Sequence, residues 1–146
     1  MNLILCGFKN CGKTTLGRKL SSEKGYAFID TDYLIEAHYD HKFNIPEIYD
    51  QYGEIEFRRI EKKVIHSLRN IKNTVIATGG GSVLDPENVA HLKKLGKLIY
   101  LKTDKEILKQ RLNNRIPKFL KNFDAVYDER ITLYEKIADE IWENGE

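Results

Sequence analysis

Two aspartates, Asp30 and Asp32, are separated by one residue at the end of the apolar run YAFID. If a strand continues through both, their carboxylates point the same way, because side chains alternate along a strand. Two ionised carboxylates about 4 Å apart repel by roughly 4 kcal/mol at an effective dielectric constant near 20. The pair therefore predicts a partner in front of it: a metal ion, a donor group on a substrate, or water.

A phosphate-binding motif precedes this pair. The segment GFKNCGKT fits the pattern G-x-x-x-x-G-K-[ST] at Gly7, Gly12, Lys13 and Thr14. It follows an apolar run and opens a helical pattern, which is the context that the motif requires, so a chance glycine-rich turn is disfavoured. Lys13 can reach the outer phosphates, and the Thr14 hydroxyl can bind Mg²⁺. The motif predicts nucleoside triphosphate binding and leaves the acceptor of the phosphoryl group open.

Short β-rich runs alternate with longer helical patterns along the chain. Strands are expected at 2–6, 26–30, 74–78, 97–102 and 139–142, and helices at 13–24, 32–40, 45–52, 54–70, 86–94, 104–114 and 123–137. This alternation predicts an α/β fold whose mostly parallel sheet is covered on both faces. Ligands of such sheets gather at the carboxyl ends of the strands. That rule selects the turn 7–14, the Asp30–Asp32 pair, the glycines at 79–81 and the loops after the fourth strand.

The composition limits the class of protein. The 146 residues are 41% hydrophobic and 32% charged, with a net charge of +2, too small to indicate a nucleic-acid partner. The two cysteines, Cys6 and Cys11, form no secreted-type disulfide framework and are expected to be reduced thiols. No apolar run reaches the length of a membrane span, and no signal peptide is indicated. We therefore expect one cytoplasmic domain with neither nucleic acid nor membrane as a partner.

Other nucleotide-binding classes fit less well. The letters DQYG at 50–53 match the Asp-x-x-Gly of GTPases, but they lie in a helical pattern with no strand before them. The letters LKTD at 101–104 lack the leading Asn or Thr of the guanine-reading motif. The chain is also too short for the large motor-type ATPases. A small kinase remains, whose acceptor binds over the same edge of the sheet.

Two groups could bind that acceptor. Arg58 and Glu61, three residues apart on a helix, are either a surface ion pair worth under about 1 kcal/mol or a guanidinium aimed at a carboxylate with Glu61 behind it. The residues alone leave both interpretations open. Gly79, Gly80 and Gly81 follow the third predicted strand. They indicate either backbone close to a ligand or repeated positive φ, with a flexible turn as the alternative.

These segments together resemble the shikimate kinase family. GFKNCGKTTLGRKL, IDTD, GEIEFRRIE, TGGGSV and ERITLYEKIAD occur in that order, and the resemblance runs from residue 2 to about residue 139. It implies a nucleoside monophosphate kinase-like fold, a three-layer α/β/α domain with a five-stranded parallel sheet in the order 2-3-1-4-5. It also implies that the chain uses ATP and Mg²⁺ to convert shikimate to shikimate 3-phosphate. One kinase domain, 1–146, would comprise a core (1–31 and 71–110), a shikimate-binding part (about 32–60) and a lid (about 112–124).

The resemblance also implies roles for individual residues. Asp32 would orient or deprotonate the acceptor hydroxyl, and Arg58 and Arg130 would pair with the shikimate carboxylate. Tyr49 and Phe57 would form an apolar wall. The full set is Lys13, Asp32 and Arg115 for catalysis; Asp32, Arg58, Gly79, Gly80, Gly81 and Arg130 for shikimate; Gly7, Asn10, Cys11, Gly12, Lys13, Thr14, Thr15, Arg111 and Arg115 for ATP; and Thr14 and Asp30 for Mg²⁺.

Two departures from the family pattern leave alternatives open. The lid segment reads RIPKFL where the family usually has Arg-Pro-Leu-Leu, with Arg115 as the best match for the lid arginine and Lys118 as a second cation. The chain ends at DEIWENGE, so the family's C-terminal helix and adenine-contacting loop are expected to be missing. The alternatives are a related small-molecule kinase, such as a gluconate kinase, and a nucleotide-binding homologue without transfer activity. We expect a monomer.

Overall fold

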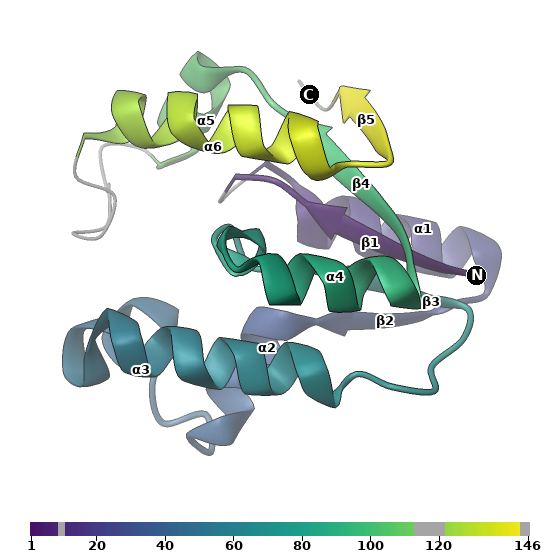
Figure 1. The fold of residues 1–146 in the computed structure, drawn as a ribbon, viewed down its shortest axis with the longest axis horizontal. Helices are drawn as coiled ribbons and strands as arrows, with labels where there is room; N and C mark the ends of the chain where they lie inside the picture. Colours follow the sequence, from purple (N-terminus) through teal and green to yellow (C-terminus); the bar gives the residue numbers. More distant parts are fainter. Residues whose placement is uncertain (9–10, 113–121, 144–146) are drawn as a thin grey trace.

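The computed structural model describes residues 1–8, 11–112 and 122–143, which form a parallel sheet with helices on both sides (Figure 1). The strands are β1 (Asn2–Cys6), β2 (Ala27–Asp30), β3 (Thr74–Ala77), β4 (Gly96–Lys102) and β5 (Glu140–Glu143). Each neighbouring pair is parallel, and the order is β2-β3-β1-β4-β5. The expected fold class and strand order are confirmed.

The helices cover this sheet. They are α1 (Lys13–Lys24), α2 (Thr31–His38), α3 (Ile45–Ser67), α4 (Pro86–Leu95), α5 (Lys105–Leu112) and α6 (Phe123–Ile137), with a short 3₁₀ helix η1 (Ser82–Leu84). In the view of Figure 1, α4 lies in front of the sheet and α1 behind it. Within the described ranges, no helix has both the length and the apolar character needed to cross a bilayer.

The central strands are apolar through their middle residues. Ile4, Leu5, Ile76, Leu98 and Ile99 are fully buried. A parallel strand covered on both faces needs such a continuous run, since neither side of it meets water. The register places Ile4 beside Ile76 on one side and beside Leu98 on the other. The carboxyl ends of β1, β3 and β4 therefore meet at one edge of the sheet.

Local signals in the sequence set where the helices begin and break. Asn44 and Glu47 form a reciprocal capping box at the start of α3, and Asp85 caps α4 by accepting the N–H of Glu87. Gly53 divides α3 with φ 85° and ψ 168°, a backbone conformation almost confined to glycine. The predicted break between helices 45–52 and 54–70 is thus confirmed.

A second, smaller core joins α2 to α3. It consists of the buried side chains Ile35, Ile48, Phe57 and Ile60, with Val64 packed against them. This core holds α3 beside the carboxyl end of β2. One side of α3 therefore faces the carboxyl edge of the sheet.

Candidate active site

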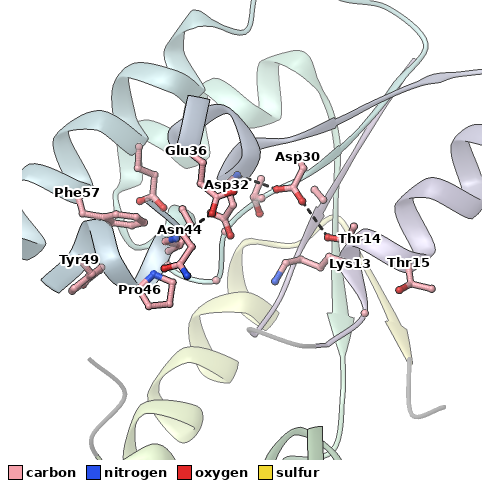
Figure 2. A pocket seen from close by; sticks show the side chains of 18 of the residues that line it. Lys13, Thr14, Thr15, Asp30, Asp32, Glu36, Asn44, Pro46, Tyr49 and Phe57 are labelled. Carbon is pink, nitrogen blue, oxygen red and sulfur yellow. Dashed lines mark hydrogen bonds between the residues drawn. The ribbon is translucent and has the colours of Figure 1, made fainter. Parts of the chain in front are cut away.

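A cavity of about 990 Å³ opens at the carboxyl edge of the sheet (Figure 2). Most of the predicted site residues line it: Gly12, Lys13, Thr14, Thr15, Asp30, Asp32, Arg58, Gly79, Gly80, Gly81, Arg111 and Arg130. Tyr49 and Phe57 also line it, as expected for an apolar wall. These residues come from six separate parts of the chain, and parallel strand packing brings them together.

Two predicted nucleotide-binding residues, Gly7 and Cys11, lie behind the cavity wall. Cys11 is 1% exposed, and a Cβ added to Gly7 would come within 2.9 Å of both the Cys11 Sγ and the Leu101 carbonyl oxygen. Gly7 has φ 149°, so it combines a close approach with a backbone angle that favours glycine. The Cys11 side chain fills space beneath the loop and does not face the cavity.

The phosphate loop ends at the N-terminus of α1. Gly12 adopts the left-handed conformation with φ 97°, and no side chain caps the helix there. The first turn also contains no acidic residue. Lys13 Nζ donates to the carbonyl oxygens of Gly7 at 2.6 Å and Phe8 at 3.0 Å. The cavity thus receives the positive end of a helix and an ammonium group, which together favour an anion such as phosphate.

Asp30 and Asp32 do not sit on one strand, so the strand geometry considered above is wrong for them. β2 ends at Asp30, and Asp32 lies in the first turn of α2. Asp30 caps that helix, with Oδ1 accepting the Asp32 N–H at 2.9 Å, and its Oδ2 accepts the Thr14 hydroxyl at 3.2 Å (Figure 2). Asp30 is therefore stabilised by donors, while Asp32 is left to face the cavity.

Asp32 has an unusual proton affinity. Burial, and then the negative charge of Asp30, raise the pKa of its carboxyl from 3.8 to about 6, although Lys13 opposes the shift. A carboxylate with a pKa near 6 is ionised at neutral pH and still accepts a proton more readily than an ordinary aspartate. That is the property required of a general base.

The Arg58–Glu61 pair is anchored in the protein interior. Arg58 Nη1 lies 2.8 Å from Glu61 Oε1, and the Glu61 side chain is only 2% exposed. Glu61 Oε2 accepts the Ser82 hydroxyl at 3.1 Å. The interpretation as a surface ion pair is therefore wrong. Arg58, with 26% of its side chain exposed, lines the cavity from α3.

The three glycines after β3 let the backbone pass close to these side chains. A Cβ on Gly79 would lie 2.6 Å from Asp32 Oδ1, and one on Gly81 would lie 2.6 Å from Arg58 Nη1. None of the three has positive φ, so that part of the prediction is wrong. The Gly79 N–H donates to the buried Thr31 hydroxyl at 3.1 Å and so already has an acceptor.

Helix α6 brings a further guanidinium to the cavity. Arg130 lines it, with its guanidinium carbon 5.5 Å from the centre of the Phe8 ring. One turn further along α6, the fully buried Tyr134 donates its hydroxyl to the Gly80 carbonyl oxygen. This hydrogen bond ties the helix that carries Arg130 to the glycine loop.

Sequence reasoning missed several residues at or behind the site. Glu36 lines the cavity and accepts the Ile45 N–H through Oε2, and its position four residues after Asp32 on a helix could have indicated it. Ser82 and Tyr134 form hydrogen bonds with residues far away in the sequence, so no local sequence pattern indicated them. Asn10, Arg115 and Lys118, with most of the predicted lid, lie outside the described residues.

This parallel sheet with its phosphate loop and acidic and basic groups defines a P-loop kinase that acts on a small molecule. A family model described as shikimate kinase matches residues 9–146. The chain belongs to the shikimate kinase family.

Individual relatives agree with this assignment. The shikimate kinase of Clostridium botulinum is 42% identical over 146 residues, covering 92% of this chain and 83% of that protein. For the shikimate kinase of Caldanaerobacter subterraneus, 40% identity extends over 112 residues, 77% of this chain and 64% of the relative. A solved structure of Acinetobacter baumannii shikimate kinase in complex with shikimate matches with a TM-score of 0.86 and 32% identity, covering 99% of this chain and 84% of that one.

Proposed function

We propose that this chain transfers the terminal phosphoryl group of ATP to shikimate, giving ADP and shikimate 3-phosphate. The observation that carries the proposal is the single cavity at which the phosphate loop, Asp32 and Arg58 meet. The transfer proposed here requires three parts: a binding site for the phosphate donor, a base for the acceptor hydroxyl, and a cation for the anionic group of the acceptor.

The proposed reaction assigns one task to each group. Lys13 and the N-terminus of α1 hold the ATP phosphates. The acceptor hydroxyl oxygen attacks the terminal phosphorus, the bond from that phosphorus to the ADP oxygen breaks, and the hydroxyl proton passes to Asp32. The raised pKa of Asp32 supports the last assignment. Most of the rate enhancement comes from alignment and charge neutralisation, because phosphoryl transfer leaves little covalent chemistry to the protein.

Mg²⁺ fits the pair formed by Thr14 and Asp30. Their hydroxyl and carboxylate oxygens lie 3.2 Å apart at the phosphate end of the cavity, and Mg²⁺ typically takes few protein oxygens together with phosphate oxygens and water. No cluster of three acidic, histidine or cysteine side chains able to hold a metal occurs in the described part of the chain. Held by these two residues together with ATP, the ion would neutralise phosphate charge.

Two arginines give the acceptor its selectivity in this proposal. Arg58, Arg130 and the glycines at 79–81 line the same cavity. In the proposal, both arginines bind the shikimate carboxylate, and the glycines contact its ring. A neutral polyol would leave both guanidinium groups without an anionic partner, which disfavours it. Arg111, also at the cavity, contacts the nucleotide, and Gly7, Asn10 and Cys11 contribute to the phosphate loop.

The remaining parts of the proposal concern the whole chain. The single domain divides into a core (1–31 and 71–110), a shikimate-binding part (about 32–60) and a lid (about 112–124) in which Arg115 stabilises the transferring phosphoryl group. The chain acts as a cytoplasmic monomer with ATP and shikimate as its partners.

The test is ADP release from Mg·ATP with and without shikimate, with the product identified by mass. Shikimate-dependent release is the expected result. If release is independent of shikimate, a panel that includes gluconate distinguishes another acceptor from inactivity. Shikimate binding without turnover would favour a homologue that has lost transfer, and absence of both binding and turnover would overturn the proposal.

A further inference from the structure

A chain of hydrogen bonds runs from Arg58 away from the cavity and into the protein. Arg58 Nη1 donates to Glu61 Oε1 at 2.8 Å, and the Ser82 hydroxyl donates to Glu61 Oε2 at 3.1 Å. Asn88 Nδ2 then donates to the Ser82 carbonyl oxygen at 2.9 Å. The chain thus connects α3, η1 and α4, and only its first two members, Arg58 and Glu61, line the large cavity.

The inner members of this chain are shielded from water. The exposed fractions are 2% for Glu61, 0% for Ser82 and 2% for Asn88. Asn88 Oδ1 lies 3.2 Å from His66 Nε2. Because the Ser82 carbonyl can only accept, Asn88 must present its amide nitrogen to it, and its oxygen then faces His66, which donates from Nε2. Each end of the Asn88 amide therefore has one defined partner.

The two oxygens of Glu61 have separate partners, and this sets the direction of Arg58. Without the Ser82 hydroxyl, one oxygen of a buried carboxylate would lack its donor, which is a costly state. The free oxygen can recover a donor by turning toward Arg58 and forming a two-pronged pair with its guanidinium. That pairing would draw the guanidinium toward α3 and leave fewer of its N–H groups available to a ligand in the cavity.

We propose that Ser82 and Asn88 are positioning residues that hold Glu61, and through it Arg58, in the direction needed to bind the acceptor carboxylate. Ser82 acts on Glu61 through its hydroxyl, and Asn88 holds the Ser82 backbone in place. The inference rests on the proposed function for the identity of the acceptor, although the hydrogen-bond chain itself does not depend on it.

The kinetic test compares Ser82→Ala and Asn88→Ala with a matched control, Asn2→Ala. Asn2 is also a buried asparagine, 3% exposed, whose amide donates to the carbonyl oxygens of Ile71 and Leu95 at the other end of β1. We expect the shikimate KM to rise about tenfold in Ser82→Ala, the typical effect of one hydrogen bond to a charged group, and to rise in Asn88→Ala as well, because Ser82 is then less firmly held. The ATP KM should stay within about twofold in all three variants.

Two further variants separate positioning from general loss of stability. Ser82→Thr keeps the hydroxyl and should recover most of the shikimate affinity, whereas Ser82→Ala removes a single oxygen atom and should fold even if Asn88→Ala does not. Equal shikimate KM values in Ser82→Ala and the Asn2→Ala control would overturn the proposal. So would a parallel rise of the ATP and shikimate KM values.

A second measurement needs no acceptor. The side-chain ¹⁵N–¹H signals of Arg58, assigned by their absence in Arg58→Lys, report the environment of the guanidinium in the protein alone. We expect these signals to move in Ser82→Ala and Asn88→Ala and to stay in place in Asn2→Ala. Unchanged signals would overturn the positioning role, whereas failure of the wild-type chain to bind shikimate would count against the proposed function alone.

Discussion

The ionised form of Asp32 is disfavoured both by burial and by the neighbouring carboxylate of Asp30. Its pKa is raised to about 6 by burial and by Asp30. Since the charged form is disfavoured in the folded chain, the side chain lowers stability at neutral pH while it remains available as a proton acceptor. A pKa shifted by burial and by a specific charged neighbour, at a cavity, is typical of functional sites.

The substitution Asp32→Asn should separate activity from stability. We expect turnover to fall by about 10²- to 10⁴-fold, the usual contribution of a positioned base. The free energy of unfolding at pH 7 should rise by about 1–2 kcal/mol, because one pKa unit corresponds to about 1.4 kcal/mol and Asp32 is only partly buried. Steady-state kinetics and urea unfolding measure the two effects.

The pH dependence of that gain follows from the direction of the pKa shift. Above pH 6 the folded wild-type chain carries the disfavoured charge, so the advantage of asparagine is fully present. Between pH 6 and pH 4 the folded chain takes up a proton that the unfolded chain does not yet bind, and the advantage declines to nothing. A variant with wild-type turnover, or with a stability gain that grows toward low pH, would contradict the assignment to Asp32.

At the scale of elements, the glycine loop after β3 is fitted to the side chains around it. Gly81 has φ −102° and could hold alanine without backbone strain. The added Cβ would instead meet the end of the flexible Arg58 side chain at 2.6 Å. The loop is therefore constrained by contacts with α3 and not by backbone torsion.

Gly81→Ala should consequently act on the acceptor and hardly on the fold. We expect the shikimate KM to rise about tenfold or more as Arg58 is displaced, with less than about 1 kcal/mol lost in the free energy of unfolding. Acceptor titrations and thermal unfolding on the same sample measure both. An unchanged shikimate KM would show that Arg58 can move without losing its function.

Gly53 is constrained in the opposite way. It has open space around its Cα, but its φ 85° and ψ 168° lie in a region almost confined to glycine. We expect Gly53→Ala to lower the free energy of unfolding by about 1–3 kcal/mol and to disturb the Tyr49–Glu54 hydrogen bond across the break in α3.

Gly25→Ala is the matched control for that substitution. Gly25 also has open space but ends α1 in the ordinary left-handed conformation, φ 68° and ψ 30°, which costs a non-glycine residue about 1–2 kcal/mol. Only Gly53→Ala should also weaken acceptor binding. Equal effects of the two variants on acceptor binding would show that the break in α3 does not contribute to the acceptor site.

For the whole molecule, the features that could be predicted from the sequence are those whose cause lies within a short segment of the chain. The alternation of apolar runs and helical patterns indicated a parallel sheet, and the rule for such sheets placed the phosphate loop, Asp30 and the glycines at one edge. The strand order came from the family resemblance, because alternation alone leaves it open. Both depend on patterns within short segments.

Contacts between distant segments could not be predicted in this way. The Ser82–Glu61 bond joins residues 21 apart, and the Tyr134–Gly80 bond joins residues 54 apart. They arise from how α3, α4 and α6 pack on the sheet, which no local pattern describes. The positive φ considered for the glycines at 79–81 was wrong for the same reason, since the side chains that they approach, Asp32 and Arg58, come from α2 and α3.

In the proposed function, the cavity binds the ATP phosphates at α1 and the acceptor carboxylate at α3, and ligand-induced stabilisation should distinguish the two ends. A ligand at about 100 times its Kd stabilises a folded chain by about 2.7 kcal/mol. We expect Lys13→Ala to lose the stabilisation by Mg·ATP and keep that by shikimate, and Arg58→Ala to do the reverse. Thermal unfolding with each ligand separately measures this. Loss of both effects in either variant would mean that the two ends do not bind independently, and the division of tasks between α1 and α3 would have to be abandoned.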